Sequence, residues 1–209
     1  GYISVAGVLN QKLNTAEIKE LHNRLASTSS VSSCTACPDG KYSAAGNGQV
    51  CGCAAGYTGR WNGLASLISL IDARDTDNAG ITPTATVGIP DLSGTSGMKW
   101  TLSSGSTPSF GTVDGIPCWD LNAGGLETST RTTLGDSYTL FYYWKPRESD
   151  TSPSGYRALH YGWDPDANSN KDYWVKISGR NLGIWSTRNG NFRDSGYDIT
   201  IEWQTLIVT

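Results

Sequence analysis

The chain has 209 residues, enough for one substantial domain with a small module or for two modest domains. It holds 25 glycines, eight prolines, a single methionine and only 17% charged residues, which excludes a helical bundle or coiled coil and favours an all-β extracellular protein. Its net charge is -3 without a basic run, and no apolar stretch approaches the length of a membrane span, so we expect neither nucleic-acid binding nor membrane insertion.

Residues 1–25 combine a strand pattern with a helix pattern. The apolar run from Tyr2 to Leu9 predicts a strand. Asn14 and Glu17 then have the spacing of a capping box, and the apolar residues that follow fall on one helical face: Ile18, Leu21 and Leu25. Because an isolated helix of about ten residues is marginal in water, we expect the strand and helix to dock onto a sheet.

Residues 26–59 are predicted to be a Ser/Thr linker followed by a disulfide-rich module. The linker, residues 26–33, has no core-forming pattern, and its hydroxyls are also compatible with an O-glycosylated stalk. The module carries a CxxC and a CxC motif with four cysteines: Cys34, Cys37, Cys51 and Cys53. Zinc binding is the less favoured alternative, since no histidine lies in the cluster, and two disulfides imply an oxidising compartment.

The pairing that we prefer in this module joins Cys34 to Cys51 and Cys37 to Cys53, although four cysteines allow three connectivities. So short a segment cannot support a hydrophobic core, and cross-links must replace it. Cys118 remains as the fifth cysteine, either a free thiol or the partner of something outside this chain.

Residues 60–209 are predicted to form the large domain. Alternating side chains indicate strands in three runs, residues 138–144, 173–177 and 199–203. Turn signals separate such runs, among them Ser93-Gly94, Ser195-Gly196 and Asn189-Gly190, the last being typical of a hairpin. Many short strands with hardly any helix predict an antiparallel sandwich or barrel, and the aromatic-rich strands favour a two-sheet sandwich.

One oxygen-rich loop is a candidate calcium site. Oxygen side chains occupy alternate positions, as a hard cation requires, at Asp164, Asp166, Asn168, Asn170 and Asp172. The loop lacks the glycine and the bidentate glutamate of an EF-hand, and a solvated turn rich in Asp and Asn is the competing interpretation. A second and weaker loop has Asp72, Asp75, Asp77 and Asn78. Calcium is thus the one cofactor that the sequence suggests.

Catalytic patterns are missing from the sequence, so we expect no enzyme activity. Glycosidases of sandwich folds use paired carboxylates on one strand, and neither Glu202 nor Glu127 has such a partner in sequence. His160 and His22 lack a nucleophile-elbow motif nearby, and we expect His160 to lie on a face of the sandwich.

Four segments of the large domain resemble laminin-G/concanavalin A-like jelly-roll domains. They read LIDARD at residues 70–75, PDLSG at 90–94, VDG at 113–115 and YTLFYYWKP at 138–146, in the order of that family's recurring motifs. The resemblance covers the chain from Arg60 onward and implies a two-sheet jelly roll, with calcium often bound near its rim. The cysteine module is similar to the EGF-like or TNF-receptor-like modules that space extracellular domains.

The N-terminal segment resembles the end of the same fold, where a final core strand precedes a short closing helix. The chain starts at Gly1 without methionine or signal peptide and stops after residues 203–209, where a complete laminin-G domain would still need strands. We therefore expect a piece of something longer. Three arrangements are possible: a window cut from a tandem array, completion by a neighbouring chain's strand, or return of residues 1–25 to their own sandwich.

Our functional hypothesis is an extracellular or cell-surface structural and adhesive protein, a repeat or filament unit held head to tail by strand complementation and disulfides. Residues 1–25 would complete a neighbouring sandwich, burying Ile3, Val5 and Val8 in the strand and docking the helix through its apolar face. The partners are then copies of the chain itself. The alternative is a lectin-like, calcium-dependent module whose partners are glycans.

Overall fold

The computed structural model describes residues 1–27, 61, 64, 66–75, 77–84, 86–94, 98–103, 107–122, 124–130, 134, 137–151, 156–163, 171–178, 180–186 and 191–209. Of residues 150, 151, 156–158, 161–163, 171–178 and 186 it describes the backbone alone. These residues form an all-β protein with antiparallel sheets and one short α-helix, as the composition predicts. No helix among them is long and apolar enough to cross a membrane.

The chain divides into two compact units, and each is described here by itself. The larger unit consists of Tyr2–Trp144 and Gln204–Thr209, and the smaller one of Lys145–Trp203 together with Gly1. The sequence predicts a single sandwich over residues 60–209, whereas the structure gives residues 145–203 a sheet of their own.

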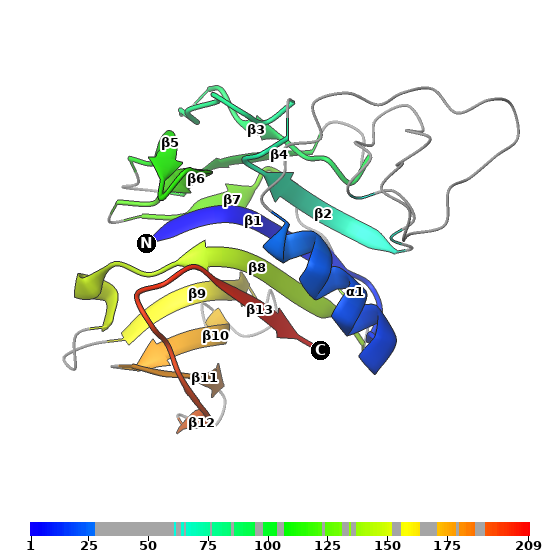
Figure 1. Cartoon of the computed structure of the whole chain (residues 1–209), viewed down its shortest axis with the longest axis vertical. Helices are drawn as coiled ribbons and strands as arrows, with labels where there is room; N and C mark the ends of the chain where they lie inside the picture. The colour runs from blue at the N-terminus through cyan, green and yellow to red at the C-terminus, as the bar shows by residue number, and fades with distance from the viewer. Residues whose placement is uncertain are drawn as a thin grey trace, which may run out of the picture. The chain divides into compact units, whose positions relative to one another are not determined.

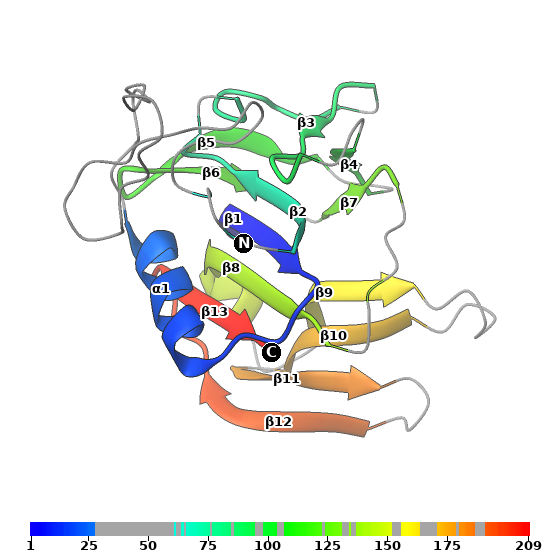
Figure 2. The same ribbon diagram turned by 90° about the vertical axis from the view of Figure 1, so that its right-hand side faces the viewer.

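A six-stranded sheet organises the larger unit. Its strands are β1 (Tyr2–Leu9), β2 (Leu67–Asp72), β5 (Ser109–Val113), β6 (Ile116–Asp120), β8 (Thr139–Lys145) and β13 (Gln204–Val208). The order is β13-β8-β1-β6-β5, and β2 pairs with β1 outside this path. Both views show β1 between β8 and β2, so the first strand of the chain is a central strand of the sheet (Figures 1 and 2).

A second, three-stranded antiparallel sheet of the larger unit contains β3 (Ile89–Pro90), β4 (Lys99–Leu102) and β7 (Leu126–Thr128). β5 and β6 form a hairpin whose two turn residues, Asp114 and Gly115, have φ angles of 53° and 77°. Positive φ at both positions is the geometry of a type I′ turn, which suits the twist of paired strands. The glycine of the VDG segment therefore occupies a turn position whose positive φ angle favours glycine.

The single α-helix, α1 (Thr15–Ala26), begins where the capping-box spacing predicts. Asn14 Oδ1 accepts hydrogen bonds from the backbone of Ala16 and Glu17, and the Glu17 side chain accepts one from the backbone nitrogen of Asn14. This reciprocal pair satisfies backbone donors that the first helical turn would otherwise leave without an acceptor. The helix predicted from residues 14–25 is therefore confirmed.

The smaller unit is a four-stranded meander in the order β12-β11-β10-β9, preceded by the 3-10 turn η1 (Glu148–Thr151). Its strands are β9 (Tyr156–Trp163), β10 (Lys171–Ser178), β11 (Asn181–Ser186) and β12 (Asn191–Asp198). β11 and β12 pair antiparallel on either side of Asn189-Gly190, as the hairpin prediction requires. The turn residues themselves lie outside the described residues.

Three predictions about individual strands need correction. Residues 199–203 are not a strand, and β13 begins only at Gln204. The Ser195-Gly196 turn is a bulge within β12, since Gly196 has φ 74° and the pairing with β11 shifts there. β8 does not alternate between buried and exposed positions: its residues from Thr139 to Trp144 are all buried, because both faces of this central strand are covered.

Candidate assembly site

The candidate site is the place where the N-terminal segment, residues 2–27, docks on the larger unit. We call the strands that receive it (β2, β6, β8 and β13), together with Trp61 and Arg74, the docking site. β1 pairs with β2 from Val5 to Leu9 and with β6 at Tyr2 and Ile3, while β8 is its other neighbour in the sheet. Within this chain the segment therefore returns to its own sheet, which is the third of the arrangements considered above.

The strand of the segment is buried on both faces. Every residue of β1 after Tyr2 is buried, including Ile3, Val5 and Val8, which are 8%, 0% and 8% exposed. Fully burying side chains of this size contributes about 1.5–3 kcal/mol each. The strand named for assembly from the sequence is thus deep in the sheet, and it lies in the same chain instead of in a neighbour.

A glycine in β1 makes room for an aromatic stack. A Cβ atom built on Gly7 would lie 2.2 Å from Phe141 Cζ, because the Phe141 ring covers the Gly7 backbone. That ring cannot retreat freely, since Phe141 is fully buried and stacks on Trp61 with ring centroids 5.7 Å apart. Any larger residue at position 7 must therefore displace a packed side chain.

The helix of the segment docks through two of its three predicted residues. Leu21 and Leu25 are fully buried, whereas Ile18 is half-buried. The helix packs against β13, and Figure 2 shows the two elements side by side. The docking face of α1 is thus centred on its C-terminal half.

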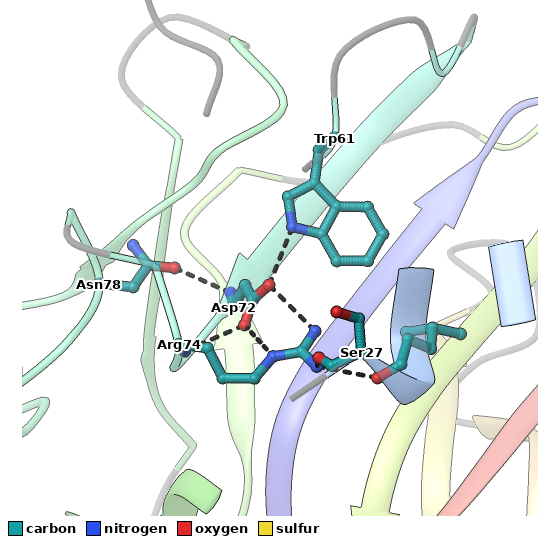
Figure 3. A network of polar contacts seen from close by, with 6 residues as sticks. Ser27, Trp61, Asp72, Arg74 and Asn78 are labelled. Atoms are coloured by element: carbon teal, nitrogen blue, oxygen red, sulfur yellow. Dashed lines mark hydrogen bonds and ion pairs between the residues drawn. The ribbon is translucent and has the colours of Figure 1, made fainter. Parts of the chain in front are cut away.

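A buried ion pair lies at the end of β2 (Figure 3). Arg74 Nε donates to Asp72 Oδ1 at 2.9 Å and its NH2 donates to Asp72 Oδ2 at 3.2 Å, with both side chains at most 2% exposed. Trp61 Nε1 donates a third side-chain hydrogen bond to this carboxylate, at 2.9 Å from Oδ2, and the Arg74 backbone nitrogen donates to Oδ1 at 3.0 Å. A buried charge pair needs such additional hydrogen bonds to offset its desolvation.

The same arginine also binds the end of α1. Arg74 NH1 donates to the backbone oxygens of Leu25 and Ser27, at 2.8 and 2.7 Å. The last carbonyls of a helix lack intrahelical donors and carry partial negative charge, so a cation there is favourable. Arg74 therefore ties the closing helix to the sheet that receives β1 (Figure 3).

An aromatic ring completes the surroundings of Arg74. Its guanidinium carbon lies 5.5 Å from the centroid of the Tyr143 ring, within the range of a cation–π contact. Burial raises the pKa of Tyr143, and the nearby guanidinium opposes that rise. The phenol is therefore neutral at physiological pH, and its ring presents a face to the cation.

Side chains of the second oxygen-rich loop take part in this network and in the adjacent turn. Asn78 accepts a hydrogen bond from the backbone of Asp72 and donates one to the backbone oxygen of Pro90, while Asp75 accepts from the backbone of Asp77. These are turn-stabilising hydrogen bonds. Within the described part of the chain, no cluster of three or more His, Cys, Asp or Glu could hold a metal ion.

The calcium and disulfide predictions fall mostly outside the described residues. Cys34, Cys37, Cys51 and Cys53 lie there, as do Asp164, Asp166, Asn168 and Asn170, and of Asp172 only the backbone is described, in β10. Cys118 is a buried free thiol in β6, 2% exposed, and burial raises its pKa to about 11.

Sequence reasoning missed the residues that hold the segment in place: Gly7, Trp61, Arg74 and Phe141. The available signal was Arg74 itself, an arginine two residues beyond the aspartate that ends an apolar strand. Comparison with known proteins adds no assignment, since no family model matches the chain and no curated protein or solved structure is significantly similar to it.

Proposed function

We propose that the protein is an extracellular structural or adhesive unit that assembles head to tail by exchanging its N-terminal segment between copies. One observation carries the proposal: the strand nearest the start of the chain, β1, is a central strand that pairs with β2, β6 and β8. A copy that gives this strand away leaves a gap that only an equivalent strand can fill.

The gap would be unfavourable in an isolated chain. Without β1, the edges of β2, β6 and β8 would expose hydrogen-bonding groups, and the faces that cover Val5 and Leu9 would meet water. The segment of another copy would restore the same pairing, the same Phe141 contact and the same Arg74 hydrogen bonds. Exchange therefore costs few contacts, as in domain swapping.

The chain connectivity permits exchange. Residues 28–60 separate the docked segment from Trp61 of the docking site in the sequence. A chain of that length spans at most roughly 110 Å when fully extended, and less where disulfides close a loop within it. Each copy uses one surface to donate and a different one to accept, so the contact is heterologous and repeats without closing unless the geometry forms a ring. Such repetition builds a filament.

The packing around the family-like motifs supports a laminin-G/concanavalin A-like jelly roll as the fold of the unit. Asp91 Oδ2 accepts hydrogen bonds from Ser69 Oγ, the Leu70 backbone and Trp100 Nε1, at 2.6, 2.9 and 2.9 Å. Ser93 Oγ donates to the backbone oxygen of Ile68 at 2.8 Å. The PDLSG turn thus bonds to β2, a structural role for polar residues of that motif.

The cysteine pattern supports an extracellular setting and a disulfide-clasped spacer. Five cysteines in 209 residues, four of them within residues 34–53, are typical of secreted modules that lack a core of their own. Cross-links in the spacer would keep it from extending under load. This arrangement fits a mechanical role between neighbouring units.

Concentration-dependent refolding tests the proposal. A tethered segment competes with its copies at an effective concentration on the order of 1 mM, so refolding above that value should give polymers and refolding far below it monomers. Light scattering and electron microscopy would measure both. Monomers at every concentration would refute exchange, and discrete particles that bind glycans only with calcium would favour the lectin-like alternative.

A further inference from the structure

The contact between Gly7 and Phe141 is more selective than the rest of the β1 interface. The backbone hydrogen bonds that pair β1 with β2 and β8 form whatever side chains the strand carries. By themselves they would allow an apolar strand to pair in several registers. Gly7 is the single glycine of β1, and it is the residue that the Phe141 ring covers. A shift by two residues would place Val5 or Leu9 under the ring.

We infer that Phe141 determines the register and the identity of the donated strand, because its ring accepts only a glycine beneath it. The inference rests on the proposed exchange of the N-terminal segment, and it names what the docking site recognises: the segment of a second copy, with glycine opposite Phe141. An apolar strand without glycine at that position, or a copy of this strand shifted in register, is excluded by the collision with the ring.

The rigidity of the ring carries the selectivity. A flexible side chain would move aside for a methyl group, but Phe141 is fully buried and stacks on Trp61 at an interplanar angle of 29°. Trp61 is itself held by its hydrogen bond to Asp72. Displacing the Phe141 ring would therefore also displace Trp61 and disturb its hydrogen bond to Asp72.

A double-mutant cycle on the full chain tests the contact within one molecule. Gly7→Ala should lower the folding equilibrium constant at least about tenfold, as overpacking does. In a Phe141→Leu background, which removes the ring atoms nearest to position 7, the same change should cost less than about threefold. Gly111→Ala in β5 is the matched control, because a Cβ there meets no atom within 4 Å.

Equal effects of Gly7→Ala in both backgrounds would overturn the inference. If Gly7→Ala alone does not fold, recovery of folding in the double variant supports it, and failure of the double variant overturns it. The cycle measures the folding equilibrium of a single chain whose own segment occupies the docking site, so its outcome does not depend on polymer formation.

Co-refolding of two tagged chains above 1 mM tests recognition between copies. The Gly7→Ala chain donates a strand that fits only the Phe141→Leu chain, whose own strand in turn fits the unaltered ring. The Phe141→Leu chain also accepts its own glycine strand, so only pairs of two Gly7→Ala chains suffer the collision. We therefore expect a Gly7→Ala chain to assemble with a Phe141→Leu chain about tenfold more often than with another Gly7→Ala chain, and equal frequencies would overturn the inference. Positive coupling in the cycle with no assemblies at all would support the contact and refute the proposed exchange instead.

Discussion

Arg74 NH1 donates a 2.8 Å hydrogen bond to the backbone oxygen of Leu25, a residue that is 49 positions earlier in the chain. The same guanidinium binds Asp72 through two of its nitrogens. One side chain therefore joins the end of β2, where the receiving sheet begins, to the end of the helix that follows the central strand. Stability of the docked segment and stability of the sheet depend on the same buried charge.

Arg74→Met should destabilise the protein by about 3–5 kcal/mol, because the Asp72 carboxylate would stay buried after losing its cation. Arg24→Met is the control, since Arg24 pairs with the half-exposed Glu20 one helical turn away, and i, i+4 pairs of this kind contribute about 0.5 kcal/mol. Urea unfolding of both variants measures the difference. Similar losses for the two variants would contradict the central role of Arg74.

Trp61→Phe separates the hydrogen bond of Trp61 from its stacking. The variant keeps a ring against Phe141 but removes the Nε1 donor to Asp72, and a hydrogen bond to a charged group contributes about 1.5–3 kcal/mol. We expect a loss of that size in denaturant unfolding. In the Asp72→Asn background the loss should fall to about 1 kcal/mol, as for a bond between neutral groups.

Asn14→Ala should cost about 1 kcal/mol by removing the acceptor of the capping box. Asn23→Ala makes the same chemical change at an exposed interior position of α1 and should be neutral or stabilising by a few tenths of a kcal/mol. Thermal unfolding followed by circular dichroism compares the pair. A larger loss from the interior substitution would refute the capping argument.

Acid should destabilise the fold through His160 in β9. Burial lowers the pKa of this imidazole to about 4, below its ordinary value of 6.5, so the unfolded chain binds the proton more tightly. The resulting loss in the free energy of unfolding is absent above pH 6.5 and grows as the pH falls toward 4, with a slope of up to about 1.4 kcal/mol per pH unit. Below pH 4 the loss reaches its full size and no longer grows. His160→Gln should flatten stability between pH 6.5 and 4. If the free energy of unfolding of His160→Gln depends on pH as steeply as before, groups other than His160 cause the acid sensitivity.

Thiol labelling tests both the burial of Cys118 and the predicted disulfides. With its pKa raised to about 11 by burial, Cys118 should resist thiol reagents at pH 8 in the folded protein. In denaturant without reductant, one thiol should react if the other four cysteines are paired. Five reactive thiols would refute the disulfides, and rapid labelling of the native protein would contradict the buried position of Cys118.

Prediction from sequence succeeded where a few neighbouring residues contain the whole signal. Asn14 and Glu17 lie three positions apart, and their mutual hydrogen bonds form within the first turn of α1. Residues 138–144 and 173–177 are long enough to show a strand on their own. Residues 199–203 alternate equally well, but in the structure they form the connection into β13. Whether a neighbouring strand pairs with them depends on the tertiary structure, which the local pattern does not contain.

The sequence alone determined the all-β class, the capped helix and the apolar character of β1, because periodicity and capping act over one or two turns of chain. Only the tertiary structure decided that β1 lies between β8 and β2, that Gly7 lies under Phe141 and that Arg74 reaches Leu25. These contacts join residues separated by tens of positions, and their formation depends on which surfaces exclude water together after the chain has closed its loops.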